Sequence, residues 1–240
     1  MSASFVRKLV DLAARPYRAA GRFPWYFARG KLRGDPAFAA LLEKGLIPSG
    51  RMLDIGCGQG LLASWLLAAR RMHEGGNWPP AWPAPPRLSA IRGIELVSRD
   101  VFWARQVFGE HAEFEQGDMC AVDFGTADTI VILDVLHYVD HAAQDDILSR
   151  VRAALPPGGV FVTRVGDADG GLPFRFSKLV DGLMFLARSG RMARFHCRAP
   201  AQWREALTRL GFDVEAYPMD QGTPFANVLL VGRVEYKEAV

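Results

Sequence analysis

Short apolar runs and longer segments with helical periodicity alternate along most of the chain. The apolar runs predict seven strands, at residues 51–55, 88–96, 112–116, 129–133, 160–165, 212–217 and 227–233. The segments between them predict helices at residues 61–69, 98–108, 143–155 and 201–210. Residues 129–133 are almost wholly apolar, which is typical of a central parallel strand that is covered on both faces. This order of elements predicts an α/β fold with a doubly wound, mostly parallel sheet.

Three segments depart from the alternation. Residues 1–45 predict a helical cap, with helices at 5–14 and 35–44 separated by proline and glycine. Residues 73–87 contain five prolines and two tryptophans, so we expect an inserted loop opposite the ligand-binding edge, with its tryptophans folded back onto the body. Residues 167–199 predict a lid after the fifth strand, with a helix at 174–186. The domain itself is expected to span residues 46–240.

The composition indicates the cellular compartment and limits the kinds of site that the protein can contain. The 240 residues suffice for one α/β domain with appendages. The three cysteines have unrelated spacings, which predicts a reduced, cytoplasmic environment and no metal site. No stretch approaches 18 consecutive apolar residues, so we expect no membrane-spanning helix.

The net charge of +3 hides an asymmetry. Residues 1–33 hold eight Lys/Arg and one Asp, and residues 171–198 hold six Lys/Arg and one Asp, so the positive excess lies in these two segments. We expect them to form a basic, apolar rim that docks an anionic partner: an acyl carrier protein, the inner face of the membrane, or RNA. A solvated lid whose apolar side covers the core remains the alternative.

The sequence Asp54-Ile-Gly56-Cys57-Gly58-Gln-Gly60 joins the first strand to a helix. Glycines suit a tight turn that approaches a ligand, and the helix behind them offers N–H groups. The spacing G-x-G-x-G differs from the dinucleotide pattern G-x-G-x-x-G, and a carboxylate at Asp54 favours a cationic ligand over a pyrophosphate. Cys57 is assigned to this ligand-binding turn, as a small packing residue and not as a nucleophile.

This motif resembles the first motif of class I S-adenosylmethionine-dependent methyltransferases, D-x-G-x-G-x-G, in full. The turn Leu-Pro-Pro-Gly-Gly at 155–159 resembles the turn before that family's fifth strand. The resemblance covers residues 46–165 and 200–233. It implies a Rossmann-like, seven-stranded sheet with an antiparallel last strand and S-adenosylmethionine as the cofactor. It also implies that Asp118 binds the adenine amino group and that Met119 packs on the adenine ring.

Further site residues follow from their positions at strand ends. Glu95 ends the second strand and is predicted to hold the ribose hydroxyls; the proline-rich insertion explains its distance from the glycines, and Glu74 lacks a preceding apolar run. Asp134 and His137 follow the fourth strand at the same edge, and Asp134 is assigned to the cofactor. His137 is the candidate general base for a hydroxyl acceptor, with a packing or capping role as the alternative; His141 and His196 are reserves.

These features predict methyl transfer to a small or carrier-bound acceptor. A looser resemblance to the methyltransferases of aryl-polyene pigment pathways implies an aromatic or polyketide-derived acceptor. Residues 134–137 lack the Asn/Asp-Pro-Pro-aromatic motif of base-modifying enzymes, which disfavours a nucleic acid substrate. A catalytically silent scaffold, an RNA methyltransferase and an NAD-dependent oxidoreductase remain as alternatives. The acceptor atom and the oligomeric state stay open.

Overall fold

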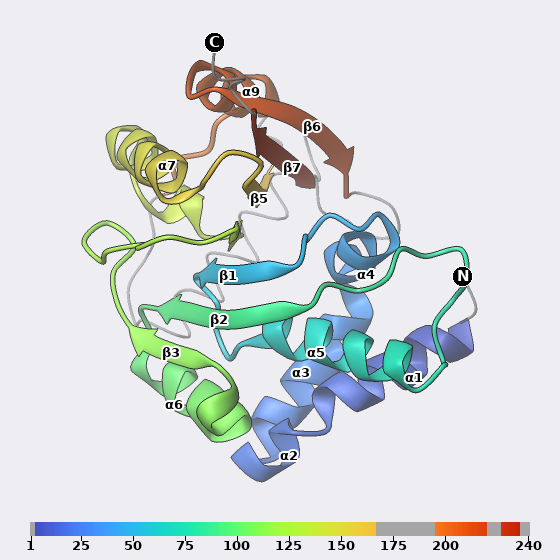
Figure 1. The fold of residues 1–240 in the computed structure, drawn as a ribbon. Coiled ribbons are helices and arrows are strands. Elements are labelled where there is room, and N and C mark those ends of the chain that lie inside the picture. Colours follow the sequence, from blue (N-terminus) through green and yellow to red (C-terminus); the bar gives the residue numbers. More distant parts are fainter. Residues whose placement is uncertain (1–2, 167–194, 220–226, 236–240) are drawn as a thin grey trace. The chain divides into compact units, whose positions relative to one another are not determined.

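The computed structural model describes residues 3–166, 195–219 and 227–235 of the chain. Within these ranges seven strands form a sheet in the order β3-β2-β1-β4-β5-β7-β6 (Figure 1). The strands are β1 Gly50–Ile55, β2 Leu88–Glu95, β3 Glu113–Gln116, β4 Thr129–Leu133, β5 Val160–Gly166, β6 Phe212–Pro218 and β7 Asn227–Val234. The predicted doubly wound α/β fold is confirmed. The chain divides into two compact units, which are described one at a time.

The first unit comprises Met1–Asp123 and Ala127–Ile130. Its strands β1, β2 and β3 are parallel. Its helices are α1 Ala3–Ala14, α2 Tyr17–Ala20, α3 Arg22–Gly34, α4 Pro36–Glu43, α5 Leu61–Glu74 and α6 Ser98–Phe108. Helices α1, α3 and α5 lie on one side of β1 and β2 (Figure 1). The predicted N-terminal helices are therefore present, in the same unit as the first three strands.

Buried hydrogen bonds join the N-terminal helices to α5. The Ser64 hydroxyl donates to the Ala13 carbonyl at 2.6 Å, and the Trp65 indole N–H donates to the Phe38 carbonyl at 2.7 Å. Both donors lie on α5, and both are buried. Because an unsatisfied buried polar group costs about 1–3 kcal/mol, these bonds fix α1 and α4 against α5.

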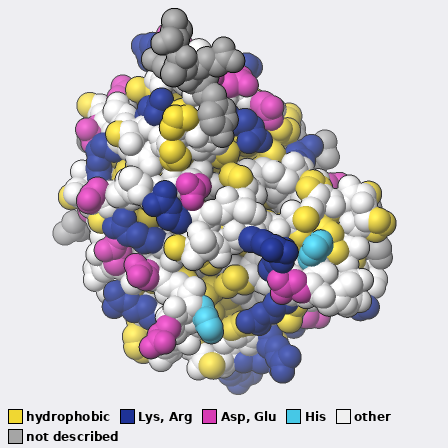
Figure 2. Space-filling model, viewed as in Figure 1, with side chains coloured by type: hydrophobic (Ala, Val, Ile, Leu, Met, Phe, Trp, Pro, Cys, Tyr) yellow, Lys and Arg dark blue, Asp and Glu magenta, His cyan; other side chains and the backbone are white. Residues whose placement is uncertain are grey.

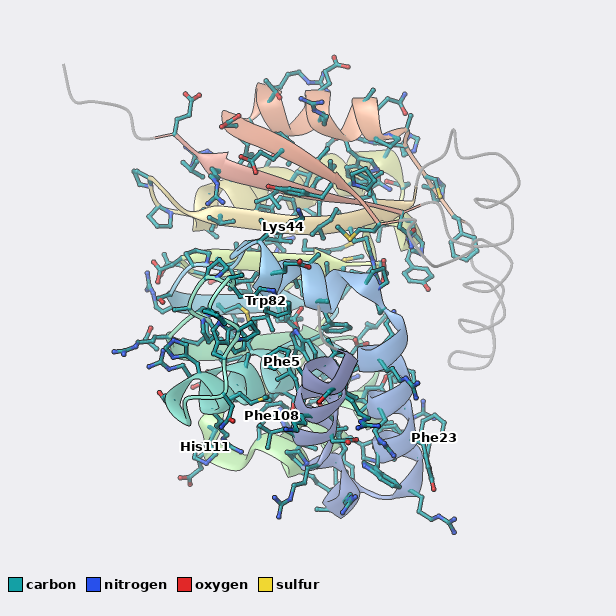
Figure 3. The ribbon with its side chains drawn as sticks, turned by 90° about the vertical axis from the view of Figure 1, so that its right-hand side faces the viewer. Phe5, Phe23, Lys44, Trp82, Phe108 and His111 are labelled. Atoms are coloured by element: carbon teal, nitrogen blue, oxygen red, sulfur yellow. The ribbon has the colours of Figure 1, made fainter. Side chains whose placement is uncertain are left out.

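The proline-rich insertion is folded back onto the N-terminal helix, as predicted. The rings of Trp78 and Trp82 pack edge-on against Phe5 of α1, with centroids 5.6 and 5.5 Å away. Figure 3 shows Trp82 and Phe5 near one another. The Trp78 indole N–H also donates to the Pro83 carbonyl at 2.9 Å. The predicted start at residue 73 was wrong, because α5 continues to Glu74, where Arg70 and Glu74 form an i,i+4 ion pair.

The second unit comprises Phe124–Thr126 and Val131–Val240. Strand β7 pairs antiparallel with both β5 and β6, which confirms the antiparallel last strand. Its helices within the described residues are α7 His141–Ala154 and α9 Pro200–Arg209. Helix α7 begins two residues before its predicted start because the Asp140 carboxylate caps it, accepting the Ala143 N–H at 2.9 Å.

Helix α6 spans the predicted residues, with Val97 at the N-cap and no side-chain bond there. The predicted helix at 174–186, and most of the predicted lid at 167–199, lie outside the described residues. In the ranges that are described, no helix is both long enough and apolar enough to cross a membrane.

Candidate cofactor site

The carboxyl ends of β1, β2 and β3 lie in register. Asp54 pairs with Gly93 across β1 and β2, and Glu95 pairs with Gln116 across β2 and β3. Open parallel sheets bind ligands at this edge. The glycine turn follows β1, Glu95 ends β2, and Asp118 follows β3. The structure therefore brings the predicted residues of the first unit to one sheet edge.

The glycine turn uses its glycines for different reasons. Gly56, Gly58 and Gly60 have φ angles of +74°, +55° and +77°, a backbone region that favours glycine. A Cβ on Gly60 would lie 2.8 Å from a ring carbon of Phe108 and 2.9 Å from one of Phe114, whereas a Cβ on Gly58 would meet nothing within 4 Å. Because Gly60 has no Cβ, the start of α5 can pack closely against the rings of Phe108 and Phe114. Gly58 borders open space that a ligand can occupy.

Several backbone N–H groups of the turn bond within the protein. Gly56 and Cys57 donate to the Ile94 carbonyl at 2.8 and 3.1 Å, and Gly60 donates to the Cys57 carbonyl at 2.9 Å. Gly58 donates to the Glu95 carboxylate at 2.9 Å. These four N–H groups of the turn are therefore not available to a ligand; the expectation about N–H groups concerned helix α5, which begins at Leu61. The turn is held rigidly against β2.

Asp54 is buried at the end of β1. Its residue is 5% exposed, and burial, with a smaller contribution from the Glu95 carboxylate, raises its pKa to about 7. A buried carboxylate beside a second carboxylate is stabilised in its charged form by a nearby cation. The residues present thus fit a cationic ligand such as S-adenosylmethionine, as the sequence predicted.

The Glu95 carboxylate bridges two backbone N–H groups. One oxygen accepts from Gly58 and the other from Val97, both at 2.9 Å. Each carboxylate oxygen has more than one acceptor position, so Glu95 keeps capacity to accept hydrogen bonds from ribose hydroxyls. Glu74, the weaker candidate, lies at the far end of the 14-residue helix α5, about 20 Å from the turn. The geometry favours Glu95.

Asp118 and Met119 lie in the turn after β3. Asp118 is exposed, and one of its carboxylate oxygens accepts the Cys120 N–H at 2.8 Å, while Met119 is partly exposed. This turn sets the direction of the Asp118 side chain. Cys57 is buried beside Gly93, where a Cβ would lie 2.8 Å from its sulfur, and burial raises the pKa of its thiol. These properties agree with the predicted packing role of Cys57.

Tyr17 was not predicted as a site residue. Its side chain on α2 is fully buried, and its hydroxyl donates to the Gln59 carbonyl in the glycine turn at 2.9 Å. Burial raises the pKa of Tyr17, so it remains a neutral donor. The residues that it joins are 42 positions apart, and no local sequence pattern marks such a contact.

In the second unit, Asp134 pairs with a buried arginine. Both carboxylate oxygens of Asp134 accept from the Arg164 guanidinium, with the Nε contact at 2.7 Å. Arg164 lies on β5 with a side chain 5% exposed, and Asp134 has a φ of +60°, unusual for a residue with a Cβ. Arginine in the apolar run at 160–165 is a signal that sequence reasoning missed. The cofactor role of Asp134 stays a prediction; in the structure its carboxylate is bound by Arg164.

His137 lies in an aromatic cluster of the second unit. It belongs to the short helix η2 Leu136–Tyr138, and its ring lies 4.3 Å from the Tyr138 ring and 5.3 Å from the Phe195 ring. Its carbonyl accepts the His196 N–H at 2.9 Å. The reserve histidines are near one another, since the rings of His141 and His196 are 6.0 Å apart.

Gln144 of α7 organises this cluster. Its side chain is fully buried, and its amide nitrogen lies within hydrogen-bonding distance of the carbonyl oxygens of Leu136, Val139 and His196, at 3.1, 3.0 and 2.7 Å. It therefore joins η2 and Val139 to His196. Among the described residues, no group of His, Cys, Asp and Glu has the arrangement of a metal site.

Comparison with known proteins identifies the family. The profile of a family described as "Methyltransferase domain" matches residues 25–217 of the chain. The chain belongs to this methyltransferase family. The class predicted from the glycine motif is thereby confirmed, and S-adenosylmethionine is its cofactor.

The methyltransferase resembles several known proteins. Its fold is similar to magnesium protoporphyrin IX methyltransferase from Synechocystis PCC 6803 with bound S-adenosylhomocysteine (TM-score 0.59, 18% identity, 93% of each chain). It is also similar to human N-acetylserotonin methyltransferase in complex with S-adenosylmethionine (0.59, 19%, 94% of this chain and 59% of that one). A carboxy-S-adenosyl-L-methionine synthase from Chromohalobacter salexigens is 28% identical over 127 residues, 51% of this chain and 42% of the relative.

Proposed function

We propose that this methyltransferase transfers the methyl group of S-adenosylmethionine to a small or carrier-bound acceptor with an aromatic or polyketide-derived ring or polyene. The observation that carries the cofactor half of the proposal is a pair of carboxylates, the buried Asp54 and the half-buried Glu95, beside the open surface of Gly58. The finer assignment to a pigment pathway of the aryl-polyene type rests on the sequence resemblance.

The residues of the first unit have separable roles in this proposal. Bound S-adenosylmethionine supplies an electrophilic methyl group on a sulfonium. Asp54 balances the positive charge of the cofactor, and Glu95 accepts from its ribose hydroxyls while its bonds to Gly58 and Val97 keep the carboxylate oriented. Asp118 and Met119 hold the adenine, and Tyr17 holds the turn through Gln59.

The acceptor half of the proposal is supported by the aromatic cluster of the second unit. The rings of His137, Tyr138 and Phe195 all contact one another, with centroids 4.3, 5.3 and 5.7 Å apart, and flat apolar side chains suit a ring-bearing acceptor. A histidine can accept the proton that a phenol or other hydroxyl loses on methylation. His137 is therefore the candidate general base, and methylation on oxygen is the chemistry that needs it.

The test is methyl transfer from labelled S-adenosylmethionine to small molecules and carrier-bound species in an extract of the source cells. Mass spectrometry of the labelled products identifies the acceptor and the methylated atom. The Asp54→Ala variant is the control, since it removes the cofactor's charge partner and should abolish labelling. Labelled RNA as the product, or no labelled product from a protein that binds the cofactor, would contradict the proposal in favour of an RNA methyltransferase or a silent scaffold.

A further inference from the structure

Helix α3 carries an outward face of arginines and aromatic rings. The positions that pack inward on this helix are Pro24, Ala28 and Leu32. On the other side, Phe23 is 61% exposed and Tyr26 is 55% exposed, among the largest exposures of bulky apolar side chains in the described part of the chain. Arg22 and Arg33 are also exposed. Figure 3 shows Phe23 at the outer side of α3.

Helix α6 continues this face. The Phe23 ring lies 5.7 Å from the Trp103 ring and 6.2 Å from the Phe27 ring, with which it stacks. Phe102, beside Trp103, is 56% exposed. We call Arg22, Phe23, Tyr26 and Phe27 of α3, with Phe102 and Trp103 of α6, the aromatic surface. Packing within the protein leaves Phe23, Tyr26 and Phe102 each more than half exposed. A cluster of exposed apolar rings is typical of a surface that a partner covers.

Guanidinium groups lie over the indole ring of Trp103, within this surface, and over that of the neighbouring Trp25. Arg18 and Arg29 lie over Trp25, 4.8 and 5.3 Å from its centroid, and Arg99 lies over Trp103 at 4.9 Å. Trp25 in turn contacts Tyr26, with ring centroids 4.6 Å apart. Arg29 also pairs with Asp11, and Arg99 with Asp100. Such arrangements present apolar rings and positive charge together.

The charged residues of α2 and α3 are all basic. Residues 17–34, which form α2 and α3, contain five Lys/Arg and no Asp or Glu. Figure 2 shows Lys and Arg side chains gathered at the lower edge of the face in view, where Figure 1 places α2. The potential at this surface therefore attracts anions, and it weakens with salt.

We infer that the aromatic surface docks the enzyme on an anionic phospholipid bilayer. Phe, Trp and Tyr rings favour the boundary between headgroups and acyl chains, and Arg beside them favours anionic headgroups. A helix that lies flat on a bilayer binds through such apolar and basic side chains alone. It needs no groove that would receive a side chain of a protein partner. The inference goes beyond methyl transfer, because it concerns where the enzyme works. Helix α6 begins at Ser98, after Leu96 and Val97, so the N-terminal end of this helix lies next to Glu95 of the cofactor site.

The test is co-sedimentation of the full chain with vesicles. Vesicles of phosphatidylcholine with phosphatidylglycerol should bind the protein at low salt, and vesicles of phosphatidylcholine alone should bind it at least tenfold more weakly. Raising the salt from about 0.1 M to about 1 M, which shortens the screening length from about 10 Å to about 3 Å, should weaken binding.

Paired variants separate charge from insertion of the rings. Arg22→Glu with Arg33→Glu should lower binding to anionic vesicles at least tenfold, and the matched control Arg87→Glu with Arg204→Glu should change it less than twofold. Phe23→Ala with Tyr26→Ala should lower binding at both salt concentrations, and Phe23→Trp with Tyr26→Trp should restore it. Unchanged melting temperatures and cofactor affinity show that these variants fold.

Three results would overturn the inference. The first is no co-sedimentation with anionic vesicles at low salt by a protein that binds the cofactor. Another is equal loss of binding in the control variant. The third is binding to an acidic carrier protein that depends on the same residues, without binding to vesicles, which would assign the surface to a protein partner.

Discussion

At the scale of single residues, the protonation of Asp54 couples the cofactor to pH. Its pKa in the ligand-free protein is about 7, so below that pH a cationic ligand must displace a proton. We expect affinity for S-adenosylmethionine to fall by up to about tenfold for each pH unit below about 7 and to level off above it. Calorimetry across this range measures the effect, and Asp54→Asn should abolish most of the pH dependence while weakening binding.

The same residue affects stability without ligand, with the opposite trend. Since burial raises the pKa of Asp54 from 3.8 to about 7, the native state binds more protons than the unfolded state between these values. Its contribution to the free energy of unfolding therefore decreases as pH rises through this window, by up to about 4 kcal/mol, and is constant above it. Comparing denaturation of the wild type and Asp54→Asn isolates this contribution from the titration of histidines.

Glu95 offers a second test at this scale. Glu95→Ala removes the acceptor of the Gly58 and Val97 N–H groups and the proposed ribose ligand, so we expect cofactor binding to weaken by about 1–3 kcal/mol. The control is Glu74→Ala, the same change at the far end of α5, which should leave affinity unchanged. Equal affinities of Glu95→Ala and wild type in calorimetry would remove Glu95 from the site.

Tyr17 tests whether the N-terminal helices support the cofactor turn. In Tyr17→Phe the Gln59 carbonyl loses its buried donor, which should cost about 1–3 kcal/mol of stability and weaken cofactor binding several-fold. Trp65→Phe removes a comparable buried bond, to the Phe38 carbonyl, so its stability loss should come without a loss of affinity. If both variants bind the cofactor like wild type, Tyr17 serves stability alone.

At the scale of elements, the period of the apolar pattern predicted most of the fold. Strand β4 begins and ends where the apolar run at 129–133 does, because such a run has few other ways to bury its side chains. Helix ends were less predictable. Helix α5 extends past its apolar face to Glu74, because the ion pair between Arg70 and Glu74 stabilises its last turn, and it ends at the cap residue Gly75. Local chemistry that lies off the buried face decides such boundaries.

The site was predictable where a motif sets the spacing, and less so where distant residues meet. Asp54, Gly58 and Glu95 follow from strand ends and glycine spacing, and the structure places them together. Tyr17 and Arg164 contact residues 42 and 30 positions away. Such contacts depend on how elements pack, and packing leaves no periodic trace in the sequence.

The element formed by η2 and the start of α7 carries the prediction for the acceptor side. If His137 is the general base, His137→Ala should lower kcat about 10²–10⁴-fold and leave cofactor affinity unchanged. His141→Ala, a matched change on the exposed first residue of α7, should have little effect. A decrease smaller than tenfold for His137→Ala would assign its ring to packing against Tyr138 and Phe195, and an acceptor that needs no base would follow.

At the scale of the whole molecule, the cofactor should stabilise the fold. A ligand at about 100 times its Kd adds about 2.7 kcal/mol to the free energy of unfolding. For a chain of this length we expect S-adenosylmethionine to raise the Tm by about 5–10 °C. NADH at the same concentration should leave the Tm unchanged, and a larger shift with NADH than with S-adenosylmethionine would favour an oxidoreductase.

The two compact units each contain one deeply buried indole. Trp65 lies in the first unit and Trp203 in the second, and each is 1% exposed. Indole emission shifts to longer wavelength when water reaches the ring. A variant in which Trp65 or Trp203 is the one tryptophan left therefore reports, by fluorescence, the unfolding of the unit that contains it. Two such proteins, titrated with denaturant, would reveal whether the halves lose their structure in one cooperative step or in sequence, and which half the cofactor protects.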